Sequence, residues 1–263
     1  MPPVSRDTAE YIAVAGRRLH GRWLSPNLPD TPIVFLHEGL GSVDLWRDFP
    51  AAVVEASGHP GLVYSRYGNG WSSPLTEPRP SDYMHTEALD VLSEIIEQLP
   101  DRPPILVGHS DGASIALIYA GSGHPVEGLV LIAPHVFVDT QTIDSISALR
   151  DSFPDSELSA KMANYHEDPE ATFAGWANVW LSDDFRSWNI GEFLAAVDCP
   201  VLLVQGDHDQ YGTIEQLDAI EAATAGAIER LMVAGAAHSP HLSHHDAVVA
   251  ATVDFIAGLP GTS

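Results

Sequence analysis

The five residues Gly108-His109-Ser110-Asp111-Gly112 constrain the fold of this chain more than any other feature. An apolar run, 104–107, precedes them, and a run of small and apolar residues, 113–120, follows. The motif is therefore G-x-S-x-G between a predicted strand and a predicted helix, the context in which it is informative. The glycines let the backbone reverse direction sharply. We expect the turn to raise Ser110 out of the packed layers as a nucleophile; the alternative is a glycine-rich turn with a capping serine.

The rest of the chain alternates short apolar runs with helical patterns, which predicts a mostly parallel sheet covered by helices on both faces. Apolar residues at helical spacing between Met84 and Leu99 predict one of these helices, and a final helix covers about 244–258. The first two strands are expected to form a hairpin. The eight predicted strands span residues 11–14, 18–23, 32–36, 61–65, 104–107, 129–132, 201–204 and 229–233.

The interval 136–198 differs from the rest because it has several helical patches and no convincing buried strand. Three of the six tryptophans fall in it, namely Trp176, Trp180 and Trp188. At ~60 residues the interval is too long for a plain connection between two elements. We interpret it as a helical lid inserted into a core formed by residues 1–135 and 199–263; the alternative is an extended, packed crossover.

Composition narrows the expected partners and location of the protein. Acidic residues number 36 against 12 basic ones, a formal net charge of −24, so neither nucleic acid nor an anionic membrane is an expected partner. The single cysteine, Cys199, excludes an internal disulfide and is expected to be buried. The first 24 residues lack a signal-peptide core, and no stretch of about 18 apolar residues is present. We expect a cytoplasmic monomer or homodimer.

Two later segments carry the groups that an activated serine requires. A serine hydroxyl is a poor nucleophile until a base removes its proton, and the base must be oriented by a third group. Two acids, Asp207 and Asp209, follow the seventh predicted strand. Two histidines, His238 and His241, follow the eighth. Open α/β sheets place their sites at this end of the strands, and the chain order serine, acid, histidine is the one expected for the motif.

With these segments the chain resembles the α/β-hydrolase superfamily along nearly its whole length, and within it the lid-bearing bacterial esterases and carbon–carbon bond hydrolases. The resemblance implies an α/β-hydrolase fold with Ser110 as nucleophile, Asp209 as acid and His238 as base. In this family the acid usually follows the glycine by three residues, which favours Asp209 over Asp207; the latter is then expected to cap a helix or bond the loop backbone. The other matching segments are His37-Glu38-Gly39-Leu40-Gly41-Ser42 and Ser65-Arg66-Tyr67-Gly68-Asn69-Gly70-Trp71-Ser72.

The histidines between 238 and 245 have spacings that would also suit a metal site. We disfavour a metal because no carboxylate or cysteine cluster accompanies them, and we expect no cofactor. His241 is expected to line the loop or the pocket. His109 is expected to pack beneath the turn, with its side chain directed away from Ser110.

An oxyanion hole needs two backbone N–H groups aimed at the oxygen that becomes negative. The resemblance places one on Asp111, and we choose Gly39 for the other, with Leu40 as the reserve. The chain departs here from the family's common His-Gly pair, because Glu38 follows His37. Glu38 is either a surface carboxylate, a substrate contact or the partner of a polar side chain, for which the candidates are His135 and Arg47.

Loops at the strand ends and the lid supply the remaining candidate pocket residues. Tryptophans in a lid more often form its own small core than contact a ligand. The candidate substrate-binding residues are Glu38, Leu40, His135, Val136, Phe137, Trp176, Trp180 and Tyr211.

These observations favour a serine hydrolase that cleaves an ester, thioester or lactone of a small-molecule acyl substrate through an acyl-enzyme. Carbon–carbon bond cleavage in a vinylogous diketone from aromatic-ring fission ranks second, because Arg47 and Arg66 are the only arginines expected near the pocket. Cofactor-free haloperoxidase chemistry would be a side reaction. Epoxide and haloalkyl hydrolysis are disfavoured, since those family members carry an aspartate in place of Ser110. A non-catalytic binding protein that retains the fold is the alternative from another class.

Overall fold

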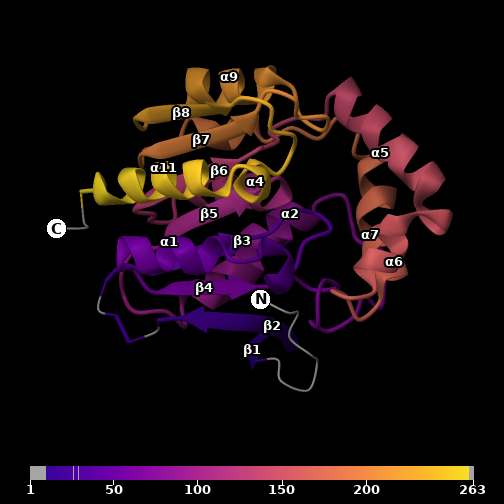
Figure 1. Ribbon diagram of the computed structural model, residues 1–263, viewed down its shortest axis with the longest axis horizontal. Helices are drawn as coiled ribbons and strands as arrows, with labels where there is room; N and C mark the ends of the chain where they lie inside the picture. Colours follow the sequence, from indigo (N-terminus) through magenta and orange to yellow (C-terminus); the bar gives the residue numbers. More distant parts are fainter. Residues whose placement is uncertain (1–9, 26, 29, 261–263) are drawn as a thin grey trace.

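The predicted strands all form, and they join in one eight-stranded sheet of order β1-β2-β4-β3-β5-β6-β7-β8 (Figure 1). The computed structural model describes residues 10–25, 27–28 and 30–260. The pairs β1–β2 and β2–β4 are antiparallel and all other pairs are parallel. The opening hairpin and the mostly parallel sheet are as predicted. The strands are β1 (Glu10–Val14), β2 (Arg17–Leu24), β3 (Ile33–Leu36), β4 (Gly61–Tyr64), β5 (Ile105–His109), β6 (Gly128–Ile132), β7 (Val201–Gly206) and β8 (Ile228–Val233).

The central strands are apolar throughout because both faces of the sheet are covered. Side chains alternate between the faces, so that Val34 and Leu36 of β3 enter one core, and Ile33 and Phe35 enter the other. The second core is closed by α1 (Phe49–Ser57) and α11 (His245–Ala257), which lie together on one face of the sheet (Figure 1). The first is closed by α4 (Asp111–Gly121), α9 (Ile214–Ala223) and the helical segment before β5.

The helix predicted between Met84 and Leu99 forms with an irregular middle. It consists of α2 (Tyr83–Thr86), the π-helical segment η3 (Glu87–Leu92) and α3 (Ser93–Ile96). The apolar residues at the predicted spacing are buried, namely Met84, Ala88, Val91, Leu92, Ile95 and Leu99. The wider π turn does not follow from that spacing, because side-chain periodicity sets which face is buried and not which carbonyl accepts each hydrogen bond.

The interval 136–198 is helical and lies beyond one end of the sheet (Figure 1). Each of its three longer helices begins at a capping side chain that accepts a backbone N–H, the residues being Asp139, Ser156 and Asp168. The last helix returns to the core, where a Cβ on Gly121 of α4 would meet Phe193. The helices are α5 (Thr140–Ser152), η4 (Phe153–Asp155), α6 (Glu157–Met162), α7 (Pro169–Trp180) and α8 (Gly191–Leu194).

The predicted core boundaries and the predicted lack of a transmembrane helix can be compared with the described residues. The predicted core extends to residues 1 and 263, and its segments 1–9 and 261–263 lie outside the described residues. Among the residues that are described, no helix combines the length and the apolar character that crossing a bilayer requires.

Candidate active site

Ser110 occupies a strained turn between β5 and α4. Its backbone has φ 53° and ψ −117°, a left-handed conformation that costs a non-glycine residue roughly 1–3 kcal/mol. Gly108 and Gly112 do not have positive φ; they are needed because the backbones approach closely. A Cβ on Gly112 would overlap the Leu36 carbonyl of β3, and one on Gly108 would overlap the first turn of α4. The glycines therefore let strand, turn and helix pack together, while the serine itself adopts the strained conformation.

His238 and Asp209 meet at the same end of the sheet. The His238 Nδ1 lies 2.9 Å from Asp209 Oδ1 and 3.0 Å from Oδ2. Oδ1 also accepts the N–H groups of Tyr211 (2.8 Å) and Gly212 (3.2 Å). Burial by itself would raise the pKa of Asp209, but the hydrogen bonds from His238 and Tyr211 outweigh it and lower that pKa. Asp209 is thus an ionised acceptor that holds His238 with Nδ1 protonated and Nε2 free to accept a proton.

The other acid of this loop, Asp207, has a different partner. Its Oδ1 accepts the N–H of Gly235 at 2.6 Å, in an exposed position. This is the bond to the loop backbone expected for Asp207. The two acids therefore differ in their partners, because Asp209 contacts His238 and Asp207 contacts the loop backbone.

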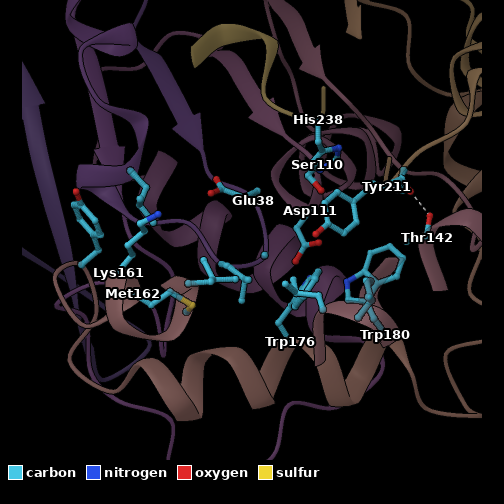
Figure 2. Close-up of a pocket in the computed structure, with 18 of the residues that line it drawn as sticks. Glu38, Ser110, Asp111, Thr142, Lys161, Met162, Trp176, Trp180, Tyr211 and His238 are labelled. Atoms are coloured by element: carbon cyan, nitrogen blue, oxygen red, sulfur yellow. Dashed lines mark hydrogen bonds between the residues drawn. The ribbon is translucent and has the colours of Figure 1, made fainter. Parts of the chain in front are cut away.

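Ser110 and His238 face one cavity of approximately 550 Å³. In Figure 2 they lie with Tyr211 at one end of the cavity, and Lys161 and Met162 of α6 lie at the other. Pockets for drug-sized ligands measure about 300–1,000 Å³, so a small molecule fits here. Of the predicted site residues, the cavity is lined by Glu38, Gly39, Leu40, Ser110, Asp111, His135, Trp176, Trp180, Tyr211 and His238.

Val136 and Phe137 do not line the cavity, in contrast to the prediction. Both backbone N–H groups point to the Gln216 side chain of α9, at 2.8 and 3.3 Å. Phe137 also forms an isolated bridge with Asn189. The chain leaving β6 is thus held against α9. The local sequence could not predict this contact, because the glutamine lies 79 residues further along the chain.

The inserted helices supply cavity residues that the sequence analysis missed. Thr142, Ile146 and Leu149 form one face of α5, and Leu158 and Met162 form one face of α6. The sequence does indicate that these residues share a helix face, because they are three or four positions apart. It does not tell whether that face covers a cavity or a solid core. The remaining additions are Leu45, Lys161, Asn164 and Tyr165, and Arg47, expected near the pocket, also lines it.

The partner of Glu38 is His109 rather than His135 or Arg47. Glu38 Oε2 lies 3.4 Å from His109 Nδ1, and His109 Nε2 lies 2.8 Å from the carbonyl oxygen of His238. Burial would raise the pKa of Glu38, but its contact with His109 lowers it. Arg47 instead donates to the Tyr165 hydroxyl at 2.7 Å. The histidine before the nucleophile therefore packs beneath the turn, as predicted, and connects the loops that carry Glu38 and His238.

His241, expected to line the loop or the pocket, lies in the short helix α10 (Pro240–Ser243), is buried and does not line the cavity. Its ring packs 5.0 Å from the Trp46 ring and 5.3 Å from the Phe49 ring. Burial lowers its pKa well below the usual range, so the imidazole is neutral. Among the described residues, no three or more histidine, cysteine or acidic side chains are arranged to hold a metal ion.

The two candidate oxyanion donors, Gly39 and Asp111, reach the same cavity as Ser110. Asp111 is the first residue of α4, so its N–H has no partner within the helix. Gly39 lies against α7, where a Cβ would overlap the Trp176 ring. A glycine is therefore required at this position by the close approach of the inserted helix.

This combination of sheet, strained serine turn and cavity at the strand ends matches a known family. The model of the Alpha/beta hydrolase family matches residues 33–251, and the chain belongs to this family. A non-heme chloroperoxidase of Kitasatospora aureofaciens is 25% identical over 214 residues, 70% of this chain and 76% of the relative.

Solved structures show the same fold at low sequence identity. An esterase from Exiguobacterium antarcticum superimposes with a TM-score of 0.75 at 17% identity, covering 95% of this chain and 99% of the esterase. An enol-lactonase from Burkholderia xenovorans gives a TM-score of 0.71 at 17% identity, covering 94% of this chain and 99% of the lactonase. The neighbours named here are hydrolases of this fold.

Proposed function

We propose that the protein is a serine hydrolase that cleaves an ester, thioester or lactone carbonyl through an acyl-enzyme on Ser110. The observation that carries the proposal is a strained serine sharing a cavity with His238, whose Nδ1 is held by the buried Asp209. The names of the neighbours, an esterase and an enol-lactonase, support carbonyl–oxygen chemistry.

The proposed reaction has two half-reactions on the same residues. His238 Nε2 takes the proton of Ser110 as the hydroxyl oxygen attacks the carbonyl carbon, and the oxyanion is held by the N–H groups of Gly39 and Asp111. The tetrahedral intermediate collapses, the bond to the leaving group breaks, and His238 protonates that group. Water then gives a proton to His238 and attacks the acyl carbon. The bond between that carbon and the Ser110 oxygen breaks, His238 returns the proton to the serine oxygen, and the acid is released.

Replacing Ser110 by alanine tests the proposal. We expect Ser110→Ala to reduce kcat for a p-nitrophenyl ester by at least about 10⁴-fold, because the nucleophile is lost. A fluorophosphonate probe should label the natural protein on Ser110 and leave the variant unlabelled. The control is Ser122→Ala at the far end of α4, whose hydroxyl donates to the Ile118 carbonyl one turn earlier. Full activity of Ser110→Ala, or a folded natural protein that resists the probe, contradicts the proposal and favours a binding protein.

The chloroperoxidase relative supports a second candidate activity. If hydrogen peroxide replaces water in the second half-reaction, the acyl-enzyme yields a peracid, which oxidises halide. We expect bromide oxidation with acetate and peroxide to disappear together with ester hydrolysis in Ser110→Ala. Carbon–carbon bond cleavage ranks lower, because Arg47 is the only arginine among the described cavity-lining residues and it already donates to Tyr165.

A further inference from the structure

Arg66, which follows β4, lies behind the two turns that carry the candidate oxyanion donors. Its side chain is 1% exposed and does not line the cavity. Its Nη2 donates to the carbonyl oxygen of Glu38 at 2.9 Å and lies 3.4 Å from Asp111 Oδ2. A single nitrogen therefore joins the turn after β3 to the turn after β5.

The bond to Glu38 acts on the peptide group that contains the Gly39 N–H. The Glu38 carbonyl oxygen accepts three donors: Arg66 Nη2 at 2.9 Å, His37 Nδ1 at 2.6 Å and Gly41 N at 3.0 Å. In a trans peptide the C=O and N–H bonds point in opposite directions. Three donors that hold the carbonyl on one side therefore direct the Gly39 N–H to the other side.

The backbone of Arg66 also orients the His37 ring. The backbone N–H of Arg66 donates to His37 Nε2 at 2.9 Å, which leaves the ring proton on Nδ1, facing Glu38. Burial, with the Arg66 charge in addition, lowers the pKa of His37 well below its usual range, so the ring is neutral. The Arg66 side chain thus supplies one donor to the Glu38 carbonyl, and the backbone N–H of the same residue, which would persist in a side-chain variant, orients a second.

The second contact of Arg66 fixes the other turn. Asp111 Oδ2 accepts the Tyr83 hydroxyl at 2.5 Å and pairs with Arg66 Nη2. Both side chains of the ion pair are 1% exposed. Because Asp111 is the first residue of α4, holding its side chain also holds the backbone N–H that we assign to the oxyanion hole.

We propose that Arg66 is a positioning residue that aligns the Gly39 and Asp111 N–H groups as one oxyanion hole. The inference rests on the proposed serine-hydrolase function. Arg66 does not touch substrate; it acts through the Glu38 carbonyl and the Asp111 carboxylate. Its charge also polarises the Glu38–Gly39 peptide, which strengthens the N–H as a donor.

Stability alone does not account for the buried pair. Removing water from two charges is costly, and replacing a buried ion pair by uncharged residues of similar size is often neutral or stabilising. Removing one partner is strongly destabilising, because the other charge stays buried and unpaired. The double variant Arg66→Met with Asp111→Asn avoids that outcome, and Arg66→Lys keeps the charge while losing the planar guanidinium.

We expect kcat of the double variant for a p-nitrophenyl ester to fall by about 10²-fold, since losing one oxyanion donor costs about 10²–10³. KM should change by less than about 3-fold, because ground-state binding does not use these N–H groups. Affinity for an alkylboronic acid, which forms a tetrahedral anion on Ser110, should fall in parallel with kcat. Affinity for the corresponding alcohol, which binds without forming a tetrahedral anion, should stay unchanged. Arg66→Lys should lie between the double variant and the natural protein.

Controls separate this inference from the proposed function. Arg230→Gln removes an arginine of the edge strand β8 that pairs with Asp218 and Glu221. This change should leave kcat and boronate affinity unchanged. A folded double variant with natural kcat and boronate affinity overturns the role of Arg66, as does a loss confined to KM. If the natural protein neither hydrolyses esters nor reacts with a fluorophosphonate, the proposed function fails instead.

Discussion

At the scale of single residues, the turns that surround Ser110 require glycines because neighbouring atoms leave no space for a Cβ. Gly112 faces the Leu36 carbonyl, Gly39 faces the Trp176 ring, and neither position has room for a Cβ. The sequence assigns Gly112 to the sharp turn of the motif and Gly39 to the oxyanion hole. The structure shows that their role is to bring β3, α4 and α7 together.

Gly112→Ala should therefore destabilise the protein although alanine favours helices. The added Cβ overlaps backbone atoms of β3, which cannot move aside as a flexible side chain would. Overpacking of this kind costs about 3 kcal/mol, which lowers Tm by roughly 6–12 °C in a chain of this size. Gly258→Ala is the matched control, because its nearest contact would be an ordinary 3.4 Å. Thermal unfolding measures both; equal Tm values for the two variants would refute the clash.

At the scale of elements, the inserted helices determine the shape of the cavity. The core provides Ser110 and His238, whereas α5, α6 and α7 provide most of the apolar lining. Two tryptophans of the insertion, Trp176 and Trp188, have the same 9% exposure but different surroundings. Trp176 lines the cavity, and Trp188 packs against Phe185 and Trp180.

Trp176→Ala and Trp188→Ala should separate specificity from stability. Each should cost about 3–5 kcal/mol of folding free energy, since a large buried ring is removed. Only Trp176→Ala enlarges the cavity beside Gly39, so we expect it alone to improve kcat/KM for bulky acyl esters relative to acetate. A panel of p-nitrophenyl esters with increasing acyl size measures the ratio. The same change of ratio in both variants would argue against a lid that selects substrate.

At the scale of the whole molecule, five buried histidines are favoured in their neutral form. Burial is the largest cause in each case, and it lowers the pKa of His20 and of His166 to about 4. The unfolded chain protonates its histidines near pH 6.5, before the folded protein does. Stability is therefore complete above about pH 6.5 and is lost as the pH falls toward 4. The other three are His37, His135 and His241.

We expect the free energy of unfolding in urea to fall by several kcal/mol between pH 7 and pH 5. Burial raises the pKa of Glu87, which acts in the opposite sense, but it is one group against five. His20→Phe keeps the ring volume without the titration, so its slope should be smaller by up to 1.4 kcal/mol per pH unit, the equivalent of about one proton. A free energy that is constant or rises over this interval would show that the histidines are not held neutral.

The sequence alone determined the order of strands and helices and the chain positions of Ser110, Asp209 and His238. The order of the elements and the position of Ser110 follow from local quantities, namely side-chain periodicity and the backbone demands of one turn. The choice of Asp209 and His238 rests on the resemblance to the α/β-hydrolase superfamily. The tertiary structure decided that Phe137 does not line the cavity, that Glu38 contacts His109, and that one arginine joins two turns. Such contacts depend on the register of neighbouring strands and on which distant loops meet at the edge of the sheet, and no local pattern encodes them.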